Sequence, residues 1–175
     1  NHLKPLIRCD MKLIFLDIDG VLNKKELLSK IDYTDVIRHD IYGSMYKSLI
    51  ERLNEITDET GAKIVLSSGW RCETFEESQA MLKLFGISGE VIGQTPQLGE
   101  YCVRGNEIRA WITENKALLG HEYHNFKQYI IIDDESDLLL EQAEHFVHVE
   151  PCSGLSDTAQ YRAVRKLNML RNITS

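Results

Sequence analysis

Short apolar runs alternate along the chain with segments whose apolar residues recur at helical spacing. Continuous apolar runs of strand length are typical of strands buried on both faces of a parallel sheet. The runs predict strands over residues 13–16, 62–66, 90–92, 129–132 and 146–149. Helical spacing predicts helices after residue 44, over 74–85, from 106 onward, over 138–143 and after 156. This alternation predicts an α/β fold, a doubly wound, Rossmann-like parallel sheet of about five strands with helices on both faces.

Residues 24–43 interrupt the alternation. Charged residues are mixed there with isolated apolar ones, and the segment is too short for a folded cap domain, so we expect a surface flap. Ser44 is expected to cap the helix that follows, and Gly61 to end it. Thr74 and Glu77 have the spacing of a capping box at the start of the next helix. The fold is therefore expected to carry only a minimal cap.

Length and composition indicate one globular domain. A chain of 175 residues, 43% of them hydrophobic, is long enough for a single domain with a sizeable core. Residues 1–10 lack periodicity and precede Met11, so we expect a tag or a disordered extension there and a single domain over 11–175. The four cysteines lack paired short spacings, which suits a reduced, cytoplasmic protein without zinc or disulfides. No apolar run approaches membrane-spanning length, and no secretion signal is evident, so a soluble protein is expected.

Polar residues follow three of the predicted strands at the points where the strands end. Because the carboxyl ends of parallel strands meet at one edge of a sheet, these side chains are expected to lie close together. Clustered carboxylates repel one another and lose solvation, so a site of this kind normally holds a cation. Oxygen ligands without histidine or cysteine favour Mg²⁺. The residues are Asp17 and Asp19, Ser67, and Asp133 and Asp134.

Such a cluster suits phosphoryl transfer. A carboxylate whose charge is screened by a metal can attack a phosphoryl group and form an aspartyl-phosphate, which water then hydrolyses. Ser67, the amides of the neighbouring turn and either Arg71 or Arg104 are candidate donors to the phosphoryl oxygens. Asp19 lies two residues after Asp17, so both side chains point the same way if the strand geometry persists, and Asp19 is then placed to protonate the leaving group.

The set of motifs resembles the haloacid dehalogenase (HAD) superfamily of phosphohydrolases. The resemblance rests on Asp17-Ile-Asp-Gly-Val, Ser67 after an apolar strand, a basic residue at Arg104, and Asp133-Asp134. It covers nearly the whole chain after Met11. More narrowly, residues 67–71, 104–108 and 132–135 resemble the small, capless HAD-like domains associated with RNA-repair proteins.

The resemblance implies a role for each matching residue. Asp17 would be the nucleophile and a Mg²⁺ ligand, and Asp19 the general acid and base whose backbone carbonyl also binds the metal. Ser67 would bind the phosphoryl group, and Asp133 would complete the metal site together with either Asp134 or Asp137. The superfamily usually has lysine at its third motif, where this chain offers Arg104, with Lys116 and Lys127 as alternatives. Further residues expected to bind phosphate or substrate are Gly20, Ser68, Gly69 and Arg71.

The minimal cap implies an open site, and family members of that type often act on large substrates. The formal net charge of -7 argues against a general polyanion-coating role, because such proteins usually carry a basic excess. A local group of basic residues nevertheless favours nucleic-acid terminal phosphates as substrate. A small metabolite, nucleotide or phosphoprotein remains an alternative, and the oligomeric state stays open. The basic residues are Lys24, Lys25, Arg71, Arg104 and Arg109.

Two other classes of protein are also compatible with the sequence. A receiver-like signalling module shares the layered α/β fold and an acidic pocket, and a non-catalytic Mg²⁺- or RNA-binding module would keep the fold without the reaction. Trp70 follows the second strand and is either a base-stacking residue or, as tryptophans at strand ends more often are, part of the core. Asp137 either binds the metal or caps the helix over 138–143 that follows it.

Overall fold

The computed structural model describes residues 11–120 and 126–170. The expectation for residues 1–10 lies outside this part of the chain. A five-stranded sheet forms the centre, with the order β5-β4-β1-β6-β7 and every neighbouring pair parallel. Its strands are β1 (Leu13–Leu16), β4 (Lys63–Leu66), β5 (Val91–Gln94), β6 (Tyr129–Asp133) and β7 (Phe146–His148). This sheet confirms the predicted fold class.

The strand order separates this fold from a receiver domain. In the flavodoxin-like order of receivers, the first strand lies between the second and third strands of the sheet. Here β1 lies between β4 and β6, the second and fourth strands of the main sheet along the chain. The receiver-like alternative therefore does not match the topology.

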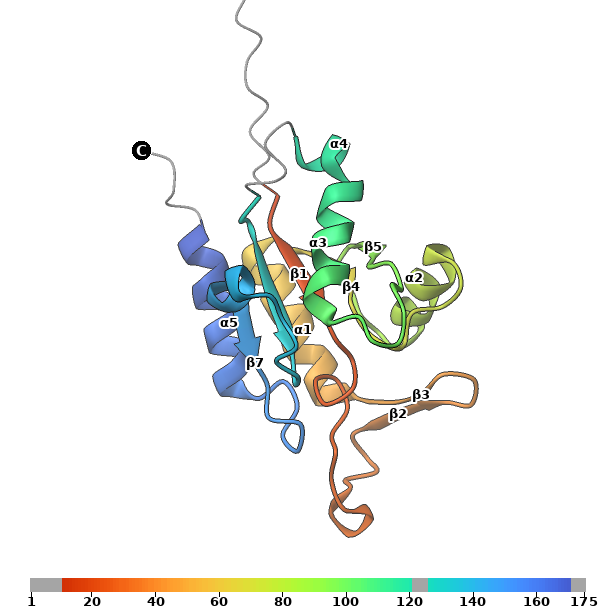
Figure 1. Ribbon diagram of the computed structural model, residues 1–175. Helices are drawn as coiled ribbons and strands as arrows, with labels where there is room; N and C mark the ends of the chain where they lie inside the picture. Colours follow the sequence, from red (N-terminus) through yellow and green to blue (C-terminus); the bar gives the residue numbers. More distant parts are fainter. Residues whose placement is uncertain (1–10, 121–125, 171–175) are drawn as a thin grey trace, which may run out of the picture.

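Helices cover both faces of the sheet (Figure 1). The core on one face joins side chains of α1, α2 and α5 to the strands, and the core on the other face joins those of α3 and α4. The α-helices are α1 (Lys47–Thr60), α2 (Phe75–Leu84), α3 (Arg104–Glu114), α4 (Lys116–Leu119) and α5 (Asp157–Met169), and the 3₁₀ helices are η1 (Leu28–Lys30) and η3 (Leu140–His145). None of the described helices is both long and apolar enough to cross a membrane.

The central strand β1 is buried along its whole length because it is packed from both sides. Ile14 and Leu16 belong to the core under α1 and α5, whereas Phe15 belongs to the core under α3. The Phe15 ring makes T-shaped contacts with Trp111 and Tyr129 at centroid distances of 5.6 and 5.5 Å. Side chains that follow β1 therefore start from a rigid support.

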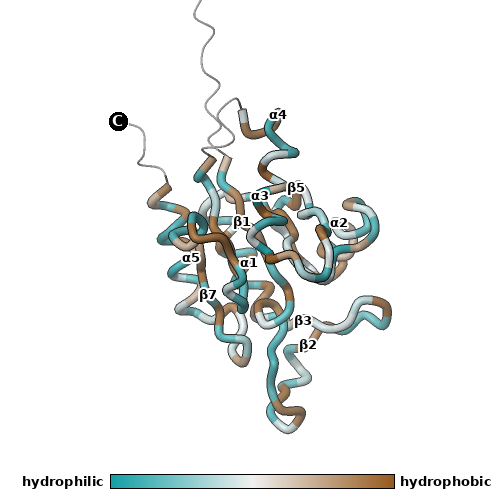
Figure 2. Tube along the Cα trace, in the orientation of Figure 1, coloured by the Kyte–Doolittle hydropathy of each residue, from teal (hydrophilic) through white to brown (hydrophobic). Residues whose placement is uncertain are grey.

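The flap contains a β-hairpin, made by β2 (Val36–His39) and β3 (Gly43–Tyr46), which projects from the main body (Figure 1). The prediction that Ser44 caps α1 is wrong, because Ser44 lies in β3 and α1 begins at Lys47. Asp35 binds the first turn of α1 instead, because its carboxylate accepts hydrogen bonds from the amide and the hydroxyl of Ser48. The segment around η1 and the turn between β2 and β3 both carry apolar residues (Figure 2). Leu28 in η1 and Ile41 in the turn are exposed.

The remaining elements lie close to their predicted positions. Thr74 and Glu77 form the expected capping box. The third strand of the main sheet runs over 91–94 rather than 90–92, and the predicted helix over 138–143 is a 3₁₀ helix over 140–145. The helix expected from residue 106 begins at Arg104, because Asp137 accepts a hydrogen bond from the Arg104 amide at 2.9 Å.

Candidate active site

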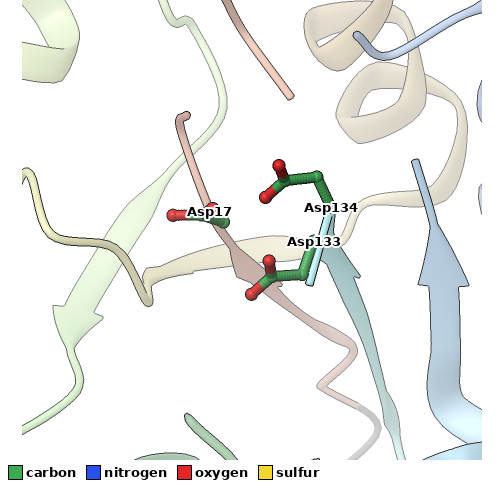
Figure 3. A group of neighbouring side chains, drawn as sticks. All are labelled: Asp17, Asp133 and Asp134. Atoms are coloured by element: carbon green, nitrogen blue, oxygen red, sulfur yellow. The ribbon is translucent and has the colours of Figure 1, made fainter. Parts of the chain in front are cut away.

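Three carboxylates gather where β1 and β6 end. Asp17 follows the last residue of β1, whereas Asp133 ends β6 and Asp134 follows it. The parallel pairing of β1 with β6 brings the two strand ends together, and one carboxylate oxygen from each residue lies within 4.8 Å of the other two. Figure 3 shows the three side chains side by side. We call Asp17, Asp133 and Asp134 the acidic triad.

Gly20 makes room for the acidic triad. The backbone turns sharply after Asp17, and Gly20 adopts a φ of +72°, which favours glycine. A Cβ atom at this position would lie 2.4 Å from Oδ2 of Asp134. Any side chain at residue 20 would therefore displace the Asp134 carboxylate.

Burial makes the acidic triad electrostatically costly. Loss of solvation raises the pKa of Asp17, although a hydrogen bond from Ser68 and the charge of Arg104 oppose the rise. Loss of solvation, and then the nearby Asp17 charge, raises the pKa of Asp133 further. A divalent cation would remove this cost, and three carboxylate oxygens are the donors that Mg²⁺ prefers. The residues present therefore fit a Mg²⁺ site.

Arg104 places a positive charge beside the acidic triad. It is the first residue of α3, and its guanidinium lies 3.9 Å from Oδ1 of Asp17 and 3.6 Å from Oδ2 of Asp133. The buried Glu107, one turn further along α3, lies 3.8 Å from the same guanidinium. Arg104 therefore lies within 4 Å of two members of the acidic triad, and its assignment to the third motif stays a prediction.

The chain matches the family of HAD domains in Swiss Army Knife RNA repair proteins over residues 13–159. The chain belongs to this family. No curated protein matches it. The family match and the five-stranded parallel sheet together confirm the resemblance that the motifs indicate.

Ser67 and Ser68 of the HAD domain lie in the turn after β4, beside the end of β1. The Ser67 amide donates to the Leu16 carbonyl at 2.8 Å, which fixes the turn against β1. The Ser67 hydroxyl is buried and has no hydrogen-bond partner among the described residues. The Ser68 hydroxyl donates a hydrogen bond to the Asp17 carboxylate. A buried hydroxyl without a partner suits the predicted role of Ser67 in binding a phosphoryl oxygen.

Asp19 follows a turn rather than a continued strand. β1 ends at Leu16, and the amides of residues 21–23 turn back onto the carbonyl of Ile18, so the strand geometry on which the shared direction depended does not persist. Asp19 is exposed and is not a member of the acidic triad. Its carboxylate accepts hydrogen bonds from Trp70 and Asn23. The predicted contact of its backbone carbonyl with a metal stays a prediction.

Arg71 makes its contacts away from the acidic triad. Its guanidinium is buried and donates to Glu107 at 2.8 Å and to Thr95 and Pro96 of the loop after β5. Arg71 and Arg104 thus share one buried carboxylate, which links the loops after β4 and β5 to α3. The predicted binding of substrate by Gly69 and Arg71 stays a prediction.

The positions of Asp137 and of the two lysines that are alternatives to Arg104 bear on their expected roles. Asp137 is not a member of the acidic triad, and it caps α3 rather than the helix that follows it. Lys127 precedes β6, at the sheet edge opposite the acidic triad, where it pairs with Glu144 at 3.6 Å. Lys116 lies in α4, beyond the end of α3 that is distant from Arg104. Arg104 is thus the best placed of the three candidates for the third motif.

Lys25 forms an ion pair with one member of the acidic triad, and sequence analysis did not predict this contact. Its ammonium group lies 2.6 Å from Oδ2 of Asp134, and the Asp134 side chain is only 4% exposed. The ion pair joins the flap to the end of β6 and raises the pKa of Lys25. The two residues are 109 positions apart, so no local pattern indicates their contact.

An open cavity of about 510 Å³ adjoins Arg104. Arg71, Glu107 and the loop that follows β5 contribute to its wall, and Arg104 lies both in this wall and beside the acidic triad. Most of the described lining residues are polar or charged, and none of them is aromatic. The lining residues are Gly69, Arg71, Gln97, Gly99, Glu100, Cys102, Arg104, Glu107 and Asp137.

Proposed function

We propose that this HAD domain is a Mg²⁺-dependent phosphatase that hydrolyses phosphomonoesters through an aspartyl-phosphate on Asp17. The observation that carries the proposal is the buried acidic triad with the Arg104 guanidinium within 4 Å of two of its members. A structural role alone gives no reason to keep three carboxylates together at such a cost in solvation. The family match supports phosphohydrolase chemistry in general.

In the first half of the proposed reaction, a carboxylate oxygen of Asp17 attacks phosphorus as the bond from phosphorus to the leaving oxygen breaks. Asp19 donates a proton to that oxygen, which departs as a neutral alcohol. In the second half, water attacks the aspartyl-phosphate, and Asp19 takes a proton from the water. Inorganic phosphate leaves, and Asp17 is again a free carboxylate.

The other site residues hold the phosphoryl group and balance its charge. The Ser67 hydroxyl donates to one phosphoryl oxygen, and Arg104 attracts the charge that spreads over these oxygens. The acidic triad would hold Mg²⁺, which would supply charge neutralisation when the phosphate approaches Asp17. The pairing of Arg104 with Asp17 and Asp133 keeps its guanidinium close to the reacting atoms.

Terminal phosphates of nucleic acid are the substrate class that we propose. The cavity beside Arg104 is open, and the flap is too small to enclose a substrate, which favours a chain end that enters next to Arg104. The family is that of HAD domains in RNA repair proteins, which favours nucleic acid as the substrate class. With a net charge of -7, the chain would bind nucleic acid through a few local contacts rather than through a broad basic face.

A substrate screen tests the proposal. Purified protein is incubated with Mg²⁺ or with EDTA and with 3′- and 5′-phosphorylated RNA and DNA oligonucleotides, mononucleotides, sugar phosphates and phosphopeptides. We expect Mg²⁺-dependent phosphate release that is fastest on oligonucleotide ends and absent in Asp17→Asn. The exposed Asp58→Asn in α1 is the matched control and should retain full activity.

Each negative outcome has a distinct meaning. Release confined to sugar phosphates or phosphopeptides would contradict the substrate class but keep the phosphatase. No release from any substrate, with Mg²⁺ binding intact, would favour the non-catalytic module. Full activity of Asp17→Asn would contradict the proposed mechanism.

A further inference from the structure

The Asp19 carboxylate is held by one of its two oxygens. Oδ1 of Asp19 accepts hydrogen bonds from the indole N–H of Trp70 at 2.9 Å and from the side-chain amide of Asn23 at 2.8 Å. Asn23 is fixed in turn, because its own side-chain oxygen accepts from the amide of Gly20 at 2.8 Å. Among the described residues, no group donates to Oδ2 of Asp19. The two oxygens of this carboxylate are therefore not equivalent.

The Trp70 ring is itself fixed by the flap and the core. Gly43, in β3, has a φ of +113°, and a Cβ atom there would lie 3.1 Å from the Trp70 ring. On the core side, Trp70 meets Phe85 at a centroid distance of 6.0 Å, and Phe85 in turn meets His39 of β2 at 4.6 Å. The indole N–H is thus aimed at Asp19 by packing on both sides.

We propose that Trp70 is a positioning residue for the proton transfer of Asp19. Trp70 and Asn23 occupy Oδ1, so the transferable proton resides on Oδ2, which donates it to the leaving oxygen as the bond to phosphorus breaks. In the second half of the reaction Oδ2 takes a proton from the attacking water. This inference rests on the proposed function, because Asp19 has a proton to transfer only if the domain is a phosphatase.

The inference predicts a dependence on the leaving group. An alkoxide is a strong base and needs a proton as it departs, whereas p-nitrophenolate is a weak base and departs without one. Loss of the Trp70 N–H should therefore slow the hydrolysis of alkyl phosphates much more than that of p-nitrophenyl phosphate. A residue that only supports the fold would affect both substrates alike.

The test compares Trp70→Phe with the parent protein on β-glycerophosphate and p-nitrophenyl phosphate with Mg²⁺. We expect the loss of kcat on β-glycerophosphate to exceed that on p-nitrophenyl phosphate by about 10-fold, a part of what general acid catalysis usually contributes. In the Asp19→Asn background, Trp70→Phe should cause no further loss, because residues that act as one unit are not additive. Benzothienylalanine placed at residue 70 keeps the two-ring shape without the N–H and should reproduce the effect if phenylalanine disturbs the packing.

The outcomes separate this inference from the proposed function. Equal losses on the two substrates, or an additive loss in the Asp19→Asn background, would overturn the role of Trp70 and leave the phosphatase in place. If the parent protein releases phosphate from neither these two substrates nor oligonucleotide ends, the proposed function and this inference fail together. Unchanged kinetics of the benzothienylalanine variant would show that the N–H does not act through Asp19.

Discussion

The stability of the metal-free protein should fall as pH rises, and Asp133→Asn should remove most of this effect. Burial raises the pKa of Asp133 to about 8 and that of Asp17 to about 6, from an ordinary value of 3.8. At pH values between the ordinary and the raised pKa of each group, the folded protein keeps a proton that the unfolded chain has already released. Asparagine is neutral at every pH and retains the side-chain oxygen that accepts from the amide of Glu135.

The sign and size of the effect follow from proton linkage. A group that binds more protons in the folded state lowers the free energy of unfolding as pH rises, by about 1.4 kcal/mol per pH unit for each proton. Asp133 alone therefore costs about 3 kcal/mol between pH 5 and pH 7, and Asp17 adds to this below pH 6. The lowered pKa of the buried His145 acts in the opposite direction, but it is common to parent and variant. The difference between the two proteins isolates the contribution of Asp133.

Urea unfolding in EDTA at pH 5, 6, 7 and 8 measures this difference. We expect the parent to lose stability relative to Asp133→Asn at each step, and Mg²⁺ to stabilise the parent more as pH rises, because cation and protons compete for the same oxygens. Asp58→Asn serves as the control and should follow the parent. A parent protein that gains stability relative to Asp133→Asn from pH 5 to pH 8 would refute the reasoning.

Three further changes test the surroundings of the acidic triad. Gly20→Ala should destabilise the fold by about 1–3 kcal/mol and weaken Mg²⁺ binding in calorimetry, because the new Cβ meets Asp134 at a positive φ; unchanged binding would contradict this. Lys25→Met should tighten Mg²⁺ binding about two- to fivefold, since the half-exposed ammonium no longer competes for Asp134, and weaker binding would contradict the competition. Asp137→Ala should lower the free energy of unfolding by about 1 kcal/mol through loss of the α3 cap. Asp137→Asn should keep most of the stability that the cap provides, because its side-chain oxygen still accepts a hydrogen bond; equal losses of the two variants in urea unfolding would contradict the cap as their cause.

The main sheet was predictable because its central strands are buried on both faces. Strands such as β1 and β6 have no solvent-facing side, so they read as continuous apolar runs whose ends can be located. The positions of Asp17 and Asp133 at these ends follow from parallel pairing alone. The edge strand β5, with half of its residues only partly buried, was misplaced by one residue at its start.

The contacts that sequence analysis missed join residues far apart in the chain. The start of α1 depends on Asp35, which lies 13 residues before Ser48 and is brought back by the hairpin. Trp70 reaches Asp19 across 51 residues, by way of packing against the flap. Local patterns carry no information on such pairs, because tertiary packing decides them. The strand geometry assumed between Asp17 and Asp19 fails for a local reason, the turn around the Ile18 carbonyl.

Trapping the phosphorylated protein tests the central claim most directly. The parent is mixed with Mg²⁺ and a phosphorylated substrate that it hydrolyses, quenched in acid within the first turnover, and digested for peptide mass spectrometry. We predict a phosphoryl group on the peptide that contains Asp17, and none in Asp17→Asn or in EDTA. Phosphate release by the parent without any phosphoryl group on Asp17, together with activity in Asp17→Asn, would contradict the account.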